Sequence, residues 1–250
     1  MIQLKTSKEL ELMREACILS ARALRLAGEM VEPGVTTEQI DKAVRKYIEG
    51  AGAKPSFLNY DGYPGSACIS INDTVIHGIP DKKTVLKAGD IVSVDVGAYL
   101  KGYHGDNAAT FPCGQISPEA QALLTATQES LYEGIKAARE GGRIGDIGSA
   151  VQRYVEERGY SVVRRYVGHG VGADLHEDPS VPNFGTSGRG IRLVKGMTLA
   201  IEPMINAGKA GVKELPDGWT VKTIDGSLSA HFEHTIAITS EGPVIMTRPD

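Results

Sequence analysis

The segment Leu86-Lys-Ala-Gly-Asp-Ile-Val-Ser-Val-Asp95 returns 107 residues later as Leu193-Val-Lys-Gly-Met-Thr-Leu-Ala-Ile-Glu202. Each copy contains an apolar run typical of a buried strand, and each ends in a carboxylate. The segments that begin at Ile40 and Ile147 share six identical residues at the same offset. Because one offset relates two separate pairs of segments, the sequence predicts two equivalent halves that divide near residue 115. A period this long with only two copies argues against a solenoid, so the halves are expected to share one core.

Each half is expected to contain two helices followed by strands, because apolar residues recur first at helical and then at strand spacing. The first half has predicted helices at 7–30, with Ser7 as the cap, and at 36–52, then strands at 67–72, 91–99 and 108–111. The second half has predicted helices at 117–140 and 146–158, then strands near 162–168, 197–205 and 230–239. An insertion near 206–228, which contains the only tryptophan, Trp219, is expected to form a flap over the site.

The composition is that of an ordinary globular protein, with 41% hydrophobic and 23% charged residues among 250. A net charge of −4 gives no reason to expect nucleic acid or a membrane surface as a partner. No apolar run approaches the roughly 20 residues of a membrane span, and the charged N-terminal residues do not resemble a signal peptide. Three scattered cysteines without a CxxC pair fit a reducing cytoplasm. We therefore expect a cytoplasmic enzyme or binding protein.

Four acidic residues occupy related positions in the two halves. Asp95 and Glu202 occupy equivalent positions in the two strands, and Asp106 and Glu233 lie on the strand expected next in each half. Taken singly, each has an ordinary alternative as a buried ion pair, a turn residue or a solvated strand residue. Taken together, carboxylates that converge on one site repel one another strongly unless cations lie between them. The pattern therefore predicts a metal site where the halves meet.

His169 is the best candidate for a nitrogen ligand, because its flanking glycines, Gly168 and Gly170, let the backbone approach a ligand closely. One histidine with several carboxylates suits Mn, Fe, Co or Zn better than Ca or Mg. His77 and His176 lack ligand spacing and are also compatible with core or loop positions. The phosphate-loop, GxSxG and HExxH signatures are absent from the sequence. A hydrolase with two metal ions is the function that the pattern favours.

Five segments in order resemble the type I methionine aminopeptidases over essentially the full chain. They are ACISINDTVIHGIP (67–80), DVGAYLKGYHGDNAATF (95–111), GHGVGADLHEDP (168–179), AIEPM (200–204) and DGWTVKTIDGSLSAHFEHT (217–235). Each is moderately specific, and all five at these spacings are very specific. The resemblance implies the α+β pita-bread fold, with two pseudo-twofold-related αβ halves whose antiparallel sheets enclose a central dinuclear metal site. Residues 1–250 would then form a single catalytic domain, with internal halves of about 1–115 and 116–250.

The resemblance also implies roles for individual residues. The five ligands of two divalent ions would be Asp95, Asp106, His169, Glu202 and Glu233, with Asp95 and Glu233 bridging. His77 and His176 would contact the scissile peptide group, and Glu202 would act as general base. The methionine side chain would lie among Tyr60, Tyr63, Cys68, Leu175 and Trp219. At Leu175 the chain departs from other members, which often have Phe.

The implied reaction is removal of the N-terminal methionine from nascent proteins and peptides. A metal-bridging hydroxide would attack the first peptide bond, and a small second residue would be preferred. The partners would be nascent chains, with transient ribosome association, and the protein would be a cytoplasmic monomer. Co, Mn, Fe and Zn all tolerate this ligand set. The absence of a long helical insertion and of an N-terminal zinc-binding extension points to the short bacterial form.

Three alternatives share the expected fold. Prolidases and proline-specific aminopeptidases usually carry an additional N-terminal domain, for which this chain has no room before its first repeat helix. Non-catalytic binding proteins of this fold typically lose metal ligands. Creatine-type amidinohydrolases and metal-dependent lyases use the fold without the five-ligand set, whereas this chain keeps all five.

Overall fold

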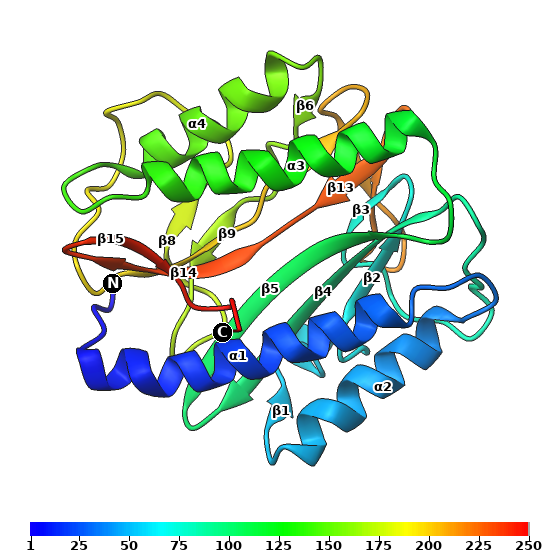
Figure 1. Cartoon of the computed structure of the whole chain (residues 1–250), viewed down its shortest axis with the longest axis horizontal. Helices are drawn as coiled ribbons and strands as arrows, with labels where there is room; N and C mark the ends of the chain where they lie inside the picture. Colours follow the sequence, from blue (N-terminus) through cyan, green and yellow to red (C-terminus); the bar gives the residue numbers. More distant parts are fainter. Residues whose placement is uncertain (250) are drawn as a thin grey trace.

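The helices form two pairs on opposite sides of the strands. The computed structural model describes residues 1–249. Its helices are α1 (Ser7–Glu29), α2 (Thr37–Gly50), the short 3-10 helix η1 (Tyr60–Gly62), α3 (Pro118–Ala137) and α4 (Ile144–Glu156). In Figure 1, α1 and α2 run below the strands, while α3 and α4 run above them. All four long helices were predicted from the sequence, with ends that differ by a few residues.

The start of α1 corrects one detail of the prediction. The Thr6 hydroxyl accepts a hydrogen bond from the Glu9 N–H (3.3 Å), and the Glu9 carboxylate accepts one from the Thr6 N–H (2.8 Å). These reciprocal bonds satisfy amide groups that have no partner within the helix. Thr6, and not Ser7, is therefore the cap of α1.

The strands of residues 1–249 are antiparallel and form four sheets. The first half contributes a four-stranded sheet of β1 (Lys54–Pro55), β4 (Ile91–Leu100), β2 (Cys68–Ile71) and β5 (Tyr103–Pro112). The second half contributes a five-stranded sheet of β15 (Gly242–Ile245), β14 (His234–Thr239), β9 (Thr198–Ile201), β7 (Gly168–Gly170) and β8 (Glu177–Val181). Two three-stranded sheets complete the set: β13 (Ser229–His231), β10 (Met204–Asn206) and β6 (Ser161–Val162), and β11 (Val212–Glu214), β12 (Val221–Thr223) and β3 (Thr74–Ile76).

The repeat inferred from the sequence is also present in the backbone hydrogen bonds. The Gly34 N–H donates to the Leu86 carbonyl, and 107 residues later the Gly141 N–H donates to the Leu193 carbonyl, both at 2.9 Å. The isolated bridges also match, since Thr36 pairs with Val85 and Arg143 pairs with Arg192. Helices α2 and α4, and strands β4 and β9, begin at the same offset. The two αβ halves are therefore related by a pseudo-twofold.

Two strands predicted as continuous, 197–205 and 230–239, are each broken. The first divides into β9 and β10 at Glu202-Pro203, and the second divides into β13 and β14 at Phe232-Glu233. Proline has no N–H to donate to a ladder, so a break at 203 follows from its chemistry. In both cases the chain leaves one sheet and enters another. The segment predicted as one strand at 162–168 likewise divides into β6 and β7, which lie in different sheets.

The insertion at 206–228 is anchored to the first half. It contains the hairpin β11–β12, and Val221 of β12 pairs with Ile76 of β3. A strand of the second half thus extends a sheet that begins in the first. The tip of this hairpin holds Trp219 against the pocket described below.

Each half packs its own hydrophobic cluster between helices and sheet. In the first half, Ile40 and Val44 of α2 belong to the same buried cluster as Val94 of β4. In the second half, Ile147 of α4 and Leu199 of β9 belong to the equivalent cluster. These clusters hold β4 and β9 in place, so they fix Asp95, which lies within β4, and Glu202, which directly follows β9. Within residues 1–249, no helix is long and apolar enough to cross a membrane.

Candidate metal centre and its pocket

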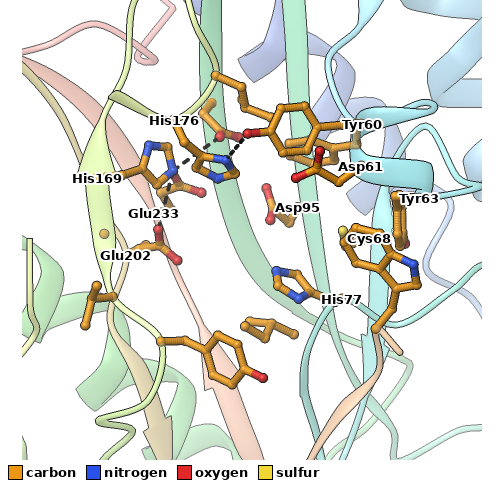
Figure 2. Close-up of a pocket in the computed structure, with 18 of the residues that line it drawn as sticks. Tyr60, Asp61, Tyr63, Cys68, His77, Asp95, His169, His176, Glu202 and Glu233 are labelled. Carbon is orange, nitrogen blue, oxygen red and sulfur yellow. Dashed lines mark hydrogen bonds and ion pairs between the residues drawn. The ribbon is translucent and has the colours of Figure 1, made fainter. Parts of the chain in front are cut away.

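A pocket of about 340 Å³ opens where the two halves meet. It is lined by every residue that the sequence predicted for the site: Asp95, Asp106, His169, Glu202, Glu233, Tyr60, Tyr63, Cys68, His77, Leu175, His176 and Trp219. Figure 2 shows His169, Glu202 and Glu233 on one side, Tyr63 and Cys68 on the other, and His77 and His176 between them. The pocket therefore has an ionisable side and an apolar side.

The long hairpin β4–β5 presents two carboxylates on one face. Asp95 lies opposite Ala108, so Asp106, two residues from Ala108, is the diagonal neighbour of Asp95 on the same face. Asp106 is almost fully buried. The ten-residue ladder leaves the pair little freedom to separate.

The second half repeats this arrangement with a histidine. His169 of β7 lies opposite Ala200 of β9, so Glu202, two residues further on, is its diagonal neighbour. The His169 Nδ1 lies 2.8 Å from the Gly170 carbonyl oxygen, which can only accept a hydrogen bond. Nδ1 therefore carries the proton, and the Nε2 lone pair is free to bind a metal.

Glu233 connects the two halves. Its N–H donates to the Ala108 carbonyl across the junction (2.8 Å). The Thr235 hydroxyl donates to the Asp106 carbonyl (2.7 Å), and the Asp106 N–H lies 3.2 Å from the same hydroxyl. One backbone hydrogen bond and the contacts of the Thr235 hydroxyl therefore hold Asp106 and Glu233 at the centre.

The side-chain atoms converge closely enough to share metal ions. One ligand atom from each of Asp106, His169 and Glu233 lies within 4.8 Å of the other two. The His169 Nε2 lies 3.8 Å from an Asp106 oxygen and 3.6 Å from a Glu202 oxygen. Asp95 and Glu202 line the same pocket outside that group of three.

Several carboxylate oxygens in this cluster are buried without a hydrogen bond. Among residues 1–249 they include Oδ1 of Asp95, Oδ1 of Asp106 and Oε1 of Glu233. A buried acceptor without a partner is costly, and a cation removes that cost by binding it. Together with one imidazole nitrogen, these oxygens form a ligand set that suits Mn, Fe, Co or Zn. The residues thus fit a divalent metal centre.

Protonation in the cluster reflects burial and crowding. Burial raises the pKa of Asp106 to about 7. Burial also raises the pKa of Asp95, Glu202 and Glu233, and the charge of Asp106 raises each further. For His169, burial lowers the pKa to about 3, so its imidazole is neutral at pH 7, the form that binds metal. A divalent cation favours the ionised carboxylates and so opposes these upward shifts.

Two further histidines face the same space. The Tyr60 hydroxyl lies 2.7 Å from the His176 Nδ1. The His77 ring meets the rings of Tyr166 and Trp219 edge to face, with centroids 5.8 and 6.1 Å away. Burial lowers the pKa of His77 to about 4, so this ring is neutral at pH 7.

The apolar side of the pocket is a small cluster of its own. Tyr63, Cys68 and Leu175 are buried in it together with Phe57. Trp219 packs edge to face on Tyr63, with centroids 5.1 Å apart. The Tyr63 hydroxyl is satisfied by the carbonyls of residues 67 and 78, so the ring presents only its apolar body.

Sequence reasoning missed several residues of this site. Phe57 and Tyr166 line the pocket, but they lie outside the segments that carried a motif. His231 is buried with its Nε2 3.7 Å from a Glu202 oxygen, and that nitrogen has no hydrogen-bond partner within residues 1–249. Its position two residues before Glu233 was a usable signal, because alternate residues of a strand share a face.

Comparisons with known proteins agree with this geometry. The model of the family described as "Metallopeptidase family M24" matches residues 11–240. Methionine aminopeptidase 1 of Bacillus subtilis is 52% identical over 248 residues, which cover 99% of this chain and 100% of that protein. Methionine aminopeptidase A of Synechocystis is 48% identical, over 98% and 97% of the two chains.

Solved structures give the same result for the fold. The crystal structure of a methionine aminopeptidase from Thermotoga maritima has a TM-score of 0.98 with 46% identity, and the match covers 100% of both chains. Prolidase from Pyrococcus furiosus has a TM-score of 0.80 at 23% identity and covers 99% of this chain but 66% of its own. At that identity the prolidase likeness concerns the fold alone, which is the pita-bread fold expected from the sequence.

Proposed function

The chain belongs to metallopeptidase family M24, and we propose that it hydrolyses the first peptide bond of peptides and proteins that begin with methionine. The protein is a metal-dependent aminopeptidase that removes N-terminal methionine. The observation that carries this function is the set of unpartnered, buried carboxylate oxygens beside an apolar pocket. Full-length identity to methionine aminopeptidases of about one half supports the same substrate.

Five residues hold the metal in this proposal: Asp95, Asp106, His169, Glu202 and Glu233. Asp95 and Glu233 come from opposite halves, and each has a buried oxygen without a partner, so both would hold a divalent ion at the junction. The ions, when bound, supply a Lewis acid for the substrate carbonyl and lower the pKa of the attacking water. The identity of the ions is one of Co, Mn, Fe and Zn.

The methionine side chain occupies the apolar side of the pocket. Tyr60, Tyr63, Cys68, Leu175 and Trp219 line it. An unbranched thioether suits such a lining, since it is apolar, flexible and makes favourable contacts with aromatic rings. Phe57, which packs with Leu175, contributes a further aromatic surface at this wall.

The proton and hydrogen-bond roles belong to three side chains. His176 donates from Nε2 to the oxygen that becomes negative during attack, in the tautomer whose Nδ1 accepts from the Tyr60 hydroxyl 2.7 Å away. Glu202 receives the proton of the attacking water and passes it to the leaving nitrogen. His77, neutral at pH 7, positions that nitrogen.

The wider biological setting follows from the substrate. A small second residue is preferred, and nascent chains are the substrates, met in transient association with the ribosome. The protein works in the cytoplasm as a monomer, with residues 1–250 as a single catalytic domain.

The decisive experiment measures methionine release from a Met-Gly-Met-Met peptide. The protein is first stripped with a chelator and then supplied with Mn, Fe, Co or Zn one at a time. We expect no release from the stripped protein and recovery with at least one of the ions. A protein that releases no methionine with any of the four would contradict the proposed function. Parallel peptides with Gly and Leu at the second position test the preference for a small residue.

A further inference from the structure

The side chains of Lys5 and Glu177 form an ion pair that solvent barely reaches. Each side chain is 4% exposed, and the Lys5 ammonium also donates to the Gln3 carbonyl (3.2 Å). Lysine and glutamate are almost never buried this deeply unless they are paired. The pair joins the N-terminal segment to the start of β8, directly after the turn that follows β7 and 172 residues away in sequence.

The surrounding backbone closes tightly on this pair. The Lys5 N–H donates to the Gly196 carbonyl (2.8 Å), and a Cβ at Gly196 would lie 2.8 Å from the Lys5 carbonyl oxygen. A Cβ at Gly172 would overlap both the Lys5 side chain and the Glu177 carboxylate. Glycine at both positions is what lets the two segments approach.

The turn that the pair holds, residues 172–176, carries two side chains of the proposed active site. Leu175 packs in the apolar pocket, and His176 is the residue directly before Glu177. The Glu177 carboxylate also accepts the Asp174 N–H (3.3 Å), so it fixes the turn from within. An ammonium that pins this carboxylate therefore limits where Leu175 and His176 can lie.

We propose that Lys5 and Glu177 are positioning residues whose buried ion pair sets the orientation of His176 towards the scissile peptide bond. This inference rests on the proposed function, in which His176 stabilises the developing oxyanion. Through this ion pair, the segment before α1 helps to hold the active-site turn in place.

A neighbouring ion pair provides the matched control. Asp178 pairs with the N-terminal ammonium at 2.7 Å, but these groups are 63% and 101% exposed. Water and salt screen such a pair, so it contributes little. Asp178→Asn therefore alters the same loop and the same N-terminal segment without touching the buried pair.

The test compares Lys5→Met, Glu177→Gln and the double variant with Asp178→Asn. Each single change leaves one buried charge without a partner, so both are expected to lower Tm, whereas the double variant removes both charges and recovers much of it. We expect kcat of the double variant to stay about 10-fold to 100-fold below wild type, with KM and bound metal little changed. A double variant whose kcat recovers together with its Tm would overturn the proposal, since the pair would then be structural only.

A second measurement does not depend on turnover. Hydrogen exchange of the amides at 172–178 is expected to be faster in the double variant than in wild type and in Asp178→Asn. Unchanged exchange at these amides would overturn the proposal even if activity fell. Wild-type protein that released no methionine would contradict the proposed function. Faster exchange in the double variant would even then support the claim that the ion pair restrains the turn.

Discussion

The two halves of the molecule share an arrangement of helices, strands and backbone hydrogen bonds, called the frame below. They differ in the functional side chains that this frame carries. Both close the start of their second helix with the same glycine-to-leucine hydrogen bond, from Gly34 in one half and Gly141 in the other. The first half then builds a ten-residue ladder, β4–β5, whereas the second uses the short strands β7 and β9. The frame therefore fixes where the carboxylates lie. Differences between the halves determine which other side chains lie beside these carboxylates.

The clearest departure concerns the imidazole. His169 lies opposite Ala200 of β9, and in the first half Ser70 of β2 lies opposite Ser93, which is 107 residues before Ala200. By this register the first half has a serine where the second half has His169, so it supplies no imidazole at that position. We infer that the two metal ions lie in unequal environments, one with the imidazole and one without.

The largest expected effect comes from Asp106→Ala, which removes a proposed ligand at the centre of the cluster. We expect metal content to fall and turnover to become undetectable, because Asp106 belongs to the group with His169 and Glu233. Elemental analysis and methionine release measure the two effects. The exposed carboxylate variant Glu129→Gln is the control. An Asp106→Ala protein with full metal content and normal turnover would remove Asp106 from the site.

The next effect tests the difference between the halves, because His176 has its role in the second half. It separates metal binding from transition-state stabilisation. His176→Ala is expected to keep its metal and to lose about 10²-fold to 10³-fold in kcat, as when an oxyanion donor is removed. Steady-state kinetics on metal-loaded protein give the result. A kcat close to that of wild type would show that His176 has another role.

The shared frame is tested by equivalent core substitutions. Ile40→Ala and Ile147→Ala each remove a fully buried side chain at the same offset. Each is expected to lower the free energy of unfolding by about 3 kcal/mol, with kcat of the folded protein retained. Urea denaturation measures the loss. If one substitution were nearly neutral, the two cores would not be equivalent in energy.

The smallest effect concerns the glycine that donates the shared hydrogen bond in each half. Gly34 and Gly141 have φ values of 94° and 86°, and a Cβ at either meets no atom closer than 3.7 Å. Alanine is therefore expected to cost about 1 kcal/mol at each site through backbone strain alone. Gly50→Ala in α2, where φ is not positive and space is open, is the control and should not destabilise. Chemical denaturation of the three variants measures the free energy of unfolding. Unequal losses of this free energy at positions 34 and 141 would show a local difference between the halves.

The sequence was sufficient to predict the helices and the pseudo-twofold, and the five residues that it named as ligands line one pocket. The reason is physical: helical spacing survives in α2 and α4, and a carboxylate in or beside an apolar strand is costly without a partner. The 107-residue offset then predicted that Asp95 and Glu202 occupy equivalent positions, without any knowledge of the fold.

What the sequence did not reveal depends on contacts between distant segments. The breaks at Glu202 and Glu233 arise because the chain changes sheets there, and strand spacing alone does not reveal which sheet a segment joins. Phe57 and His231 enter the site only through packing against other strands. The Lys5–Glu177 pair joins two segments that share no pattern.

The hydrogen bonds that cross the junction have a consequence for how the molecule is put together. The Ala108 carbonyl accepts from the Glu233 N–H (2.8 Å), and the Thr110 hydroxyl donates to the His231 carbonyl (2.8 Å). A chain cut near residue 115 would leave these groups of the first fragment facing water, and each fragment would hold an incomplete set of ligands. The two fragments would behave as subunits of an obligate heterodimer, and uptake of a divalent ion would report their reassembly.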